Sequence, residues 1–390
     1  MIAPLGVAAG PAGALLLPAH PDADAAARVL RGHVADLPPA WSFYAYAVAG
    51  DREAALAALG DDALAGYNRF VLTGDPALYA QLRAAFDGDL RCLVDAAAYA
   101  HGAVDDEPAG VAVDPVVAAY LVYSRGETER FAPAAAAVAE RAPVLAARLF
   151  RRDALRRAGD ATQTDALLAA LERARALLSG TALTIDAADV ALQYGLIAHE
   201  RSDGRRDRLL AAVNAYQRAL LGFTKDGPYV EQYALAQMNL GLAYLALPMN
   251  DEAERLRPAI ALQSLREAAS ALDPQRSPDL WAGATLNLAN ALQHARSTHV
   301  EDNLWEAVAL YEDILPVVAA GDPLRKARVL ANQGNALAHL GAFSRAVPRL
   351  NEARAHFAFA HDDDATTAID ATLAEIAARA QPAESTHGTP

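Results

Sequence analysis

The sequence predicts an all-α fold in which a helical hairpin is repeated to form an α-solenoid, after an additional irregular helical N-terminal region. Four similar segments follow one another between Asp186 and Asp364, and each has the pattern of two short helices. Hydrophobic residues make up 53% of the chain and aromatic residues only 6%, because alanine, the strongest helix former, supplies most apolar side chains. Since such a repeat cannot close its own core, consecutive units must stack.

The first helix of each repeat carries a polar column. Its aligned residues are separated by 46, 48 and 45 positions, and they are Gln193, Asn239, Asn287 and Asn332. The same alignment gives a second column of small residues, Gly195, Gly241, Ala289 and Gly334. Small side chains there allow the two helices of a hairpin to approach closely.

The second helices have a column of their own, which consists of Ala212-Val213, Ala259-Ile260, Ala307-Val308 and Ala346-Val347. Four residues after each alanine, Tyr216, Tyr311 and Leu350 are predicted to fill the core, and Gln263 is the exception. After the fourth hairpin, apolar residues recur at three- to four-residue spacing, at Ile369, Leu373, Ile376 and Ala377. This spacing predicts a helix that caps the final repeat.

The N-terminal part is organised differently. Residues 1–24 are punctuated by Pro and Gly and predict either a small hairpin that turns at Gly10-Pro11 or a packed arm. Residues 25–160 predict short helices, either divergent repeats or a separate cap, and two of them begin at Asp75-Pro76 and Asp114-Pro115. We interpret the arginine-rich segment 151–165 as a solvated helix face, with a binding patch as the alternative, and it leads into a repeat region at 161–380. Residues 381–390 have the composition of a disordered tail.

Composition argues against several functions. The formal net charge of −14 is unfavourable for nucleic-acid binding. No apolar run reaches the ~18 residues that span a bilayer, and the apolar N-terminus has no Lys or Arg before it, so we expect a cytoplasmic protein without a membrane segment. We predict that Cys92 is a small buried hydrophobic side chain. Nearly all 34 basic residues are arginine, a bias typical of high-GC bacterial sequences.

The aligned hairpins resemble tetratricopeptide (TPR) repeats in the bacterial form with longer loops, over roughly 186–364. The resemblance is closest in SPDLWAGATLNLANALQ with EAVALYEDIL, and in YVEQYALAQMNLGLAYL with PAIALQSLREAAS. It implies a TPR-like α-solenoid whose first helices line a concave groove. At this register, an asparagine of a TPR protein can hold a peptide backbone or a terminal carboxylate.

The resemblance therefore implies a set of partner-binding residues in the groove: Gln193, Asn239, Asn287, Asn290, Gln293, Arg328, Asn332 and Asn335. Relatives that clamp a carboxylate also place a basic residue one helical turn before an asparagine, and here Arg328 alone fits, four residues before Asn332. The corresponding positions in the other repeats hold Asp189, Leu235 and Gly283. In the alternative, the amides bond to neighbouring repeats and fix their stacking, and Arg328 is solvated or ion-paired.

The leading hypothesis is a non-enzymatic scaffold or adaptor that binds a protein or peptide segment in the groove. The alternatives are a sensor that responds to a small molecule or peptide, and an enzyme whose site lies between residues 24 and 160. Polar-tipped residues of that region are Tyr44, Tyr46, Tyr67, Arg69, Tyr79, Arg91, His101 and Tyr120. No cofactor or metal site is predicted, because nucleotide-binding loops and metal-ligand spacing are missing from the sequence. Self-association through the last hairpin is a rival use of the groove, and the oligomeric state is left open.

Overall fold

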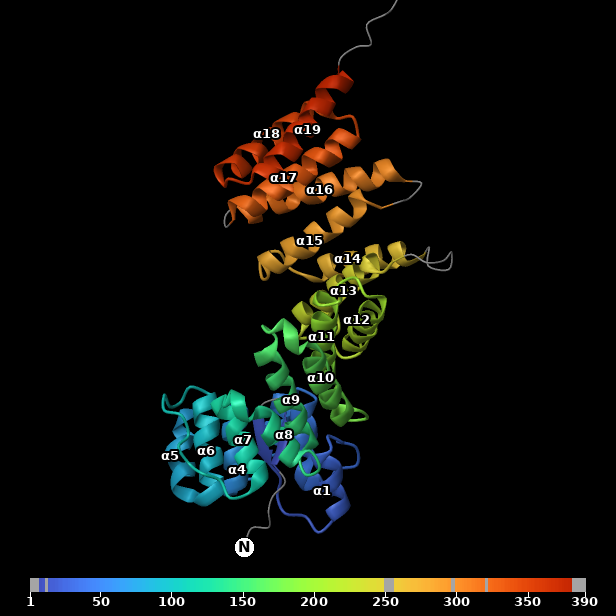
Figure 1. Cartoon of the computed structure of the whole chain (residues 1–390). Helices are drawn as coiled ribbons and strands as arrows, with labels where there is room; N and C mark the ends of the chain where they lie inside the picture. Colours follow the sequence, from blue (N-terminus) through green and yellow to red (C-terminus); the bar gives the residue numbers. More distant parts are fainter. Residues whose placement is uncertain (1–6, 11–12, 249–255, 296–298, 320–321, 381–390) are drawn as a thin grey trace, which may run out of the picture. The chain divides into compact units, whose positions relative to one another are not determined.

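The computed structural model describes residues 7–10, 13–248, 256–295, 299–319 and 322–380. The described part is all-α apart from one small hairpin, and its helices pack sequentially in adjacent pairs, as in a solenoid (Figure 1). The predicted fold class is therefore confirmed. Contacts divide the chain into two compact units, unit 1 (Met1–Asp203) and unit 2 (Gly204–Pro390). This division lies inside the first of the four predicted hairpins, and the boundary expected at 160/161 lies inside unit 1.

Unit 1 surrounds a short sheet with helices. Short 3₁₀ segments occur at Pro39–Trp41, Thr128–Arg130 and Ala161–Gln163. The regular elements are β1 (Val7–Gly10), β2 (Gly13–Leu16), α1 (Ala23–Leu30), α2 (Ser42–Val48), α3 (Arg52–Ala57), α4 (Ala63–Thr73), α5 (Pro76–Ala85), α6 (Gly88–Ala100), α7 (Pro115–Arg125), α8 (Phe131–Val138), α9 (Pro143–Arg157), α10 (Thr164–Leu178) and α11 (Thr184–Glu200). The predicted helix starts are confirmed, because Asp75 and Asp114 cap α5 and α7 and a proline follows each of them.

The second strand of the N-terminal hairpin lies in the core of unit 1, where Ala14, Leu15 and Leu16 are buried. β1 and β2 are antiparallel, with Val7 opposite Leu16 and Gly10 opposite Gly13, so the hairpin alternative is the correct one. A two-stranded sheet leaves backbone groups unpaired, and the Asn68 side chain of α4 satisfies a pair of them on β2. Its Oδ1 accepts from Leu16 N at 2.8 Å, and its Nδ2 donates to Leu16 O at 2.7 Å. The buried strand is thereby fixed to a helix 52 residues further along the chain.

A second long-range contact closes unit 1. Gly32, the second residue after α1, accepts a hydrogen bond through its carbonyl oxygen from Ala182 N at 2.8 Å, in the turn between α10 and α11. Gly32 has a φ of +79°, and a side chain there would also meet Thr181. Only glycine combines this backbone conformation with so close an approach.

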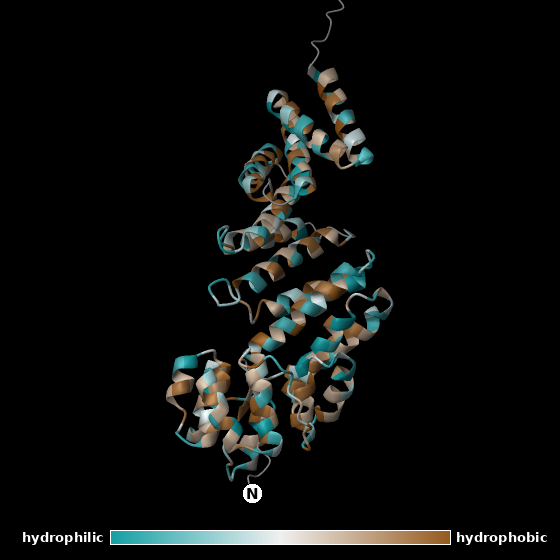
Figure 2. Cartoon of the chain, turned by 90° about the vertical axis from the view of Figure 1, so that its left-hand side faces the viewer, coloured by the Kyte–Doolittle hydropathy of each residue, from teal (hydrophilic) through white to brown (hydrophobic). Residues whose placement is uncertain are grey.

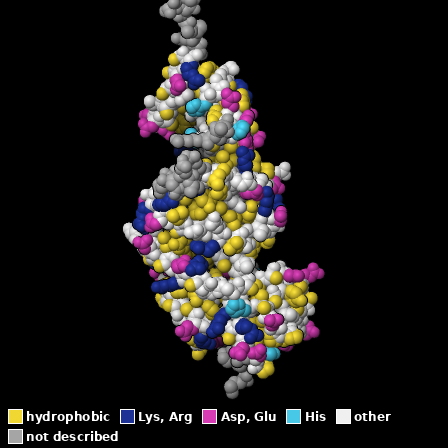
Figure 3. Space-filling model, turned by 90° about the vertical axis from the view of Figure 1, so that its right-hand side faces the viewer, with side chains coloured by type: hydrophobic (Ala, Val, Ile, Leu, Met, Phe, Trp, Pro, Cys, Tyr) yellow, Lys and Arg dark blue, Asp and Glu magenta, His cyan; other side chains and the backbone are white. Residues whose placement is uncertain are grey.

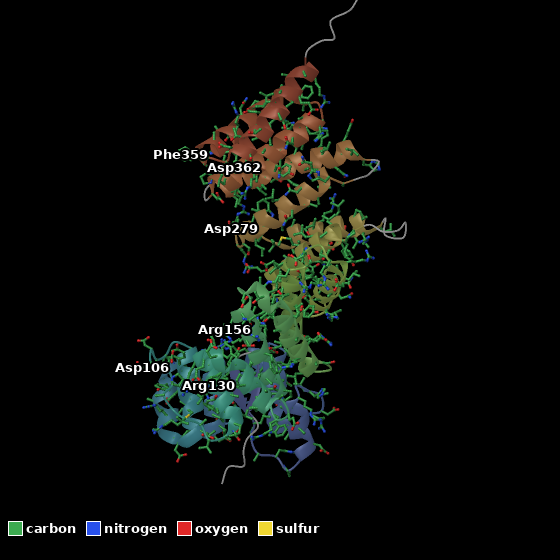
Figure 4. All side chains as sticks on the ribbon, viewed as in Figure 1. Asp106, Arg130, Arg156, Asp279, Phe359 and Asp362 are labelled. Carbon is green, nitrogen blue, oxygen red and sulfur yellow. The ribbon has the colours of Figure 1, made fainter. Side chains whose placement is uncertain are left out.

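The arginine-rich segment does not form a solvated face, contrary to the prediction. α9 extends through Arg157, and its arginines other than Arg152 are bound to acidic groups from other turns and helices. Arg151 pairs with Asp189 at 2.5 Å, and Arg156 pairs with Glu129 at 2.8 Å (Arg156 is labelled in Figure 4). Arg157 pairs with the buried Asp153. The sequence did not indicate this, because the partners of Arg151 and Arg156 lie on distant segments.

Unit 2 consists of helices that pack on their sequence neighbours. Its elements are α12 (Arg206–Ala219), α13 (Val230–Ala246), α14 (Arg257–Ala271), α15 (Pro278–Gln293), α16 (Val300–Ala319), α17 (Pro323–His339), α18 (Phe343–Phe359) and α19 (Asp363–Ala380). The hairpins α13–α14, α15–α16 and α17–α18 follow the predicted order. These helices carry both hydrophobic and hydrophilic residues, as Figure 2 shows.

The register predicted for the second helices needs one correction. Ala259 and Ile260 are exposed, whereas Ala261 is buried and its carbonyl oxygen lies next to Gly241. Ala261 therefore belongs to the alanine column, and the residue four positions later is the buried Leu265. The exception at Gln263 disappears with this correction. Tyr216, Tyr311 and Leu350 are fully buried, as predicted.

The glycine column allows close packing, as predicted. A Cβ atom at Gly241 would lie 2.8 Å from Leu265 Cγ, and one at Gly334 would lie 2.6 Å from Leu350 Cγ. Both distances are too short for a real contact. A larger residue at either glycine would therefore force the two helices of its hairpin apart. The glycines thus set the spacing within a hairpin.

The C-terminal helix caps the last hairpin, as predicted. α19 contacts both α17 and α18, and Ile369 and Ile376 are buried against them. Leu373 is half-buried in the same cluster, while Ala377 is exposed and does not contribute to it. The predicted tail, 381–390, lies outside the described residues.

None of the described helices combines the length and apolar character that a bilayer crossing requires. On the face drawn in Figure 3, acidic and basic side chains are interspersed.

Candidate functional site

The first helices of the hairpins in unit 2 form one continuous side of that unit. α13 contacts α15, α15 contacts α17, and α17 contacts α19. We call the side formed by α13, α15 and α17 the first-helix face. The second helices are joined separately by ion pairs, Arg266 with Glu306 at 2.5 Å and Arg345 with Glu312 at 2.9 Å. The predicted binding residues of unit 2 all belong to the first helices.

Two contacts fix how α15 and α17 lie against each other. Arg325 contacts Asp279 at 3.4 Å near the beginning of both helices (Asp279 is labelled in Figure 4). Further along both helices, Asn332 Nδ2 donates to Asn290 Oδ1 at 2.9 Å. Both residue numbers increase from the first contact to the second, so the two helices run in the same direction. Residues between these contacts on α17 therefore lie beside residues between them on α15.

A hydrogen-bond network joins three of the predicted binding residues of unit 2, Asn290, Gln293 and Asn332, through Tyr311. The hydroxyl of Tyr311 on α16 lies 2.8 Å from Asn290 Oδ1 and 2.9 Å from Gln293 Oε1, and its single proton serves one of them at a time. Burial raises the pKa of Tyr311 well above its ordinary value, so the hydroxyl remains neutral and can donate. Asn290, Gln293 and Asn332 thus join three helices, as the stacking alternative expects.

Asn239 is also engaged within the protein. Its Nδ2 donates to Leu235 O at 2.9 Å, one turn earlier on the same helix. This bond uses a backbone carbonyl that already belongs to the helix ladder, and it holds the amide against α13. Asn239 therefore keeps its Oδ1 and the second N–H of its Nδ2 for a partner.

The middle of the row is different. Asn287 and Asn335 are half-buried, and among the described residues no side-chain hydrogen bond is found for either. Arg328 is exposed, and no ion pair to it occurs within the described part of the chain. Arg328 lies between Arg325 and Asn332 on α17, just as Asn287 lies between Asp279 and Asn290 on α15. Arg328 and Asn287 thus lie on neighbouring helices between the two contacts, whereas Asn335 lies about one turn beyond Asn332 on α17.

The remaining predicted residue, Gln193, lies on α11 and belongs to unit 1, where it is half-buried. Asp189, one turn earlier on α11, pairs with Arg151. Burial raises the pKa of Asp189 despite this arginine, and Arg151 opposes the effect of burial. Asp189 therefore forms an ion pair that joins α11 to α9 within unit 1.

The polar-tipped residues of the N-terminal region fall into three groups. Tyr44 and Tyr67 are fully buried, and Tyr46 is exposed. Tyr79 donates to Asp95, and both Arg69 and Arg91 donate to backbone carbonyls. His101 and Tyr120 line a cavity of about 650 Å³ in unit 1.

Tyr123 and Arg148, which the sequence did not single out, also line this cavity, together with Arg152 of the arginine-rich segment 151–165. Arg148 forms two hydrogen bonds to Asp186, at 2.7 and 3.0 Å, and Arg152 lies over the Tyr123 ring at 3.8 Å from its centroid. The signal in the sequence was the pair of arginines at helical spacing on α9. It was too general to identify a cavity, because solvated helix faces have the same pattern.

No cluster of three or more potential metal ligands is found in the residues that the structure describes. Cys92 is a buried free thiol, in agreement with its predicted role as a small core side chain. Burial raises its pKa, which leaves the thiol protonated and unreactive near neutral pH.

Comparison of the sequence with known families and with curated proteins finds no family model that matches and no curated protein that matches. The function must therefore be inferred from the first-helix face of unit 2 and from the cavity of unit 1.

Proposed function

We propose that this protein is a non-enzymatic scaffold that binds an extended peptide segment of a partner protein on the first-helix face of unit 2. The observation that carries the proposal is the exposed Arg328 of α17, which lies near the half-buried Asn287 of α15. Neither Asn287 nor Asn335, which lies further along α17, has a side-chain hydrogen bond among the described residues. Asn287 and Asn335 can each donate to a carbonyl and accept from an N–H of a peptide backbone.

Arg328 adds a preference for a carboxylate. Its guanidinium offers a planar set of donors that fits a carboxylate through two parallel hydrogen bonds. A chain terminus or an acidic side chain of the peptide would supply this group. The proposal agrees with the resemblance to TPR repeats, although only one repeat has the basic residue of the carboxylate-binding pattern.

The test uses a library of immobilised peptides with free C-termini and the same peptides amidated, probed with the full chain. The variant Arg328→Ala should lose binding by about tenfold or more, since a charge-assisted pair contributes about 1.5–3 kcal/mol. The double variant Asn287→Ala/Asn335→Ala should weaken free and amidated peptides alike. Gln263→Ala is the matched control, because Gln263 lies on the second helix α14 and, among the described residues, its side chain bonds to Glu267 of its own helix alone.

Three outcomes distinguish the parts of the proposal. Binding that Arg328→Ala removes and Gln263→Ala preserves supports it. Equal binding of free and amidated peptides would assign the carboxylate to an internal acidic side chain. Binding that is insensitive to both first-helix variants, or a library with no binder, would refute the proposed face.

A further inference from the structure

A cavity of about 650 Å³ lies in unit 1, and nothing in the proposed function uses it. It is bounded by the end of α6, by α7 and by α9, with Val71 of α4 and the segment after α6 completing the wall. The volume is in the range of sites for small organic molecules, ~300–1,000 Å³. Every lining residue belongs to unit 1.

The wall combines apolar and polar parts. Val71, Ala97, Val104 and Leu145 provide an apolar portion. Tyr99, Tyr120, Tyr123 and Ser124 provide hydroxyl groups, and His101 is held at the rim because its Nε2 donates to Val71 O at 2.9 Å. A ligand that fits both parts must itself have an apolar body and a polar group.

Arg148 supplies one fixed cation. Its side chain is 14% exposed, and its two hydrogen bonds to Asp186 hold the guanidinium in one orientation. Burial alone would lower the pKa of Arg148, but the Asp186 carboxylate outweighs burial and raises it. Because Asp186 compensates this charge, Arg148 offers a ligand N–H donors in a fixed orientation but little net charge.

Arg152 supplies the uncompensated charge. Its Nη1 donates to Tyr123 O at 2.5 Å, and its guanidinium lies 3.8 Å from the centroid of the Tyr123 ring. Within the described residues, every other arginine of α9 has an acidic partner, whereas no carboxylate pairs with Arg152. A half-buried guanidinium that is fixed by a carbonyl and a ring, and that lacks a counter-ion, favours an incoming anion.

We propose that this cavity binds a small organic anion. Its carboxylate or phosphate group pairs with Arg152 and receives hydrogen bonds from the neighbouring tyrosine hydroxyls. Its apolar body contacts Val71, Ala97 and Leu145. Asp105 also borders the cavity, but it is exposed and water screens its charge, so it does not replace the missing counter-ion of Arg152.

The test is isothermal titration calorimetry of the full chain with five probes. Benzoate, hexanoate and phenyl phosphate each carry an apolar body and an anion; inorganic phosphate carries the anion alone, and benzyl alcohol carries the apolar body alone. We expect at least one of the first three probes to bind and to raise the melting temperature in proportion to the logarithm of its concentration. Inorganic phosphate and benzyl alcohol should bind at least tenfold more weakly. The preference between carboxylate and phosphate probes identifies the anion.

Variants assign the binding to this cavity. Arg152→Gln should weaken the best probe at least tenfold, and Arg152→Lys should restore part of the affinity, since charge returns without the planar donors. Arg156→Gln is the matched control one turn further along α9, because Arg156 pairs with Glu129 and does not line the cavity. Ala100→Leu, at an exposed position on the cavity wall, should block the probe without removing a polar group.

The proposal fails if none of the three amphipathic anions binds, or if benzyl alcohol binds as tightly as benzoate. It also fails if Arg152→Gln and Ala100→Leu, both folded by circular dichroism, bind the probe like the unmodified protein. If Arg152→Gln does not fold, Ala100→Leu and protection of Arg152 by the probe from phenylglyoxal modification decide the question.

Discussion

Asn332 on α17 donates its side-chain amide to Asn290 on α15 at 2.9 Å, and this bond joins the first helices of two consecutive hairpins. The same row on α17 contains Asn335, for which the described residues offer no side-chain bond. Two asparagines three residues apart thus have different roles.

We therefore expect Asn332→Ala to destabilise unit 2 by about 1 kcal/mol, the typical net contribution of an intramolecular hydrogen bond. Asn335→Ala should change stability by no more than about 0.5 kcal/mol. Hydrogen exchange of α15 and α17 peptides, followed by mass spectrometry, measures both changes locally. Equal destabilisation by the two variants would contradict the distinction.

Gly334→Ala should destabilise the last hairpin by about 1–3 kcal/mol, because the new Cβ would overlap Leu350 and separate α17 from α18. Gly283→Ala is a matched control in the interior of α15, where the nearest atom is Arg325 Nη2 at 3.9 Å. There the substitution should stabilise the helix by about 0.5–1 kcal/mol. Urea denaturation of both variants should give changes of opposite sign, and the same sign would be evidence against the close approach at Gly334.

Arg148→Met should destabilise unit 1 by about 3–5 kcal/mol, since it leaves the Asp186 carboxylate without its largely buried partner. Arg175→Met breaks an exposed pair with Glu172 and should cost no more than about 1 kcal/mol. The double variant Arg148→Met/Asp186→Leu should recover much of the loss. Thermal unfolding of the three proteins checks the order, and a loss from Arg148→Met as small as that from Arg175→Met would be inconsistent with it.

Alkaline conditions should destabilise unit 1 through Tyr44. Burial, reinforced by Asp186 and opposed by Arg148, raises the pKa of Tyr44 to about 12 from its ordinary value of 10.0. The folded chain therefore keeps a proton that the unfolded chain releases, so stability falls as pH rises from about 10 to about 12 and is unaffected by this group below that range. Tyr44→Phe should reduce this slope. It should also be neutral or stabilising at pH 7, because the buried Tyr44 hydroxyl has no hydrogen-bond partner in the described part of the chain.

Tyrosinate absorbance and thermal unfolding between pH 9 and 12 measure the effect. A Tyr44→Phe protein with an unchanged alkaline slope would place the responsible groups elsewhere, among other buried tyrosines such as Tyr67.

The repeat could be predicted because helix pairs leave a periodic pattern in the sequence. The polar, small and apolar columns of α13, α15 and α17 all follow from the packing of one hairpin. The register of α14 was predicted two residues too early, since loop length varies between repeats and Ala259 resembles Ala261 in sequence. Only the contact with Gly241 distinguishes the two alanines.

Contacts between distant segments could not be predicted in this way. Asn68 has no feature that marks it as the partner of Leu16, and the spacing of Arg148 and Arg152 is equally typical of a solvated helix. Their acidic or aromatic neighbours come from α11 and α7, and no periodic pattern connects those segments. The sequence likewise did not distinguish Asn332, which bonds to α15, from Arg328, for which the described residues offer no hydrogen bond or ion pair.

The bond between Gly32 and Ala182 has a consequence for folding. It closes a loop of 150 residues, and the entropy of that closure must be offset before the contact contributes to stability. Unit 2 has mostly neighbour contacts, so its helices can form in steps and α19 can open first. We therefore expect unit 1 to fold more slowly and more cooperatively than unit 2, since folding rates decrease as contacts become less local.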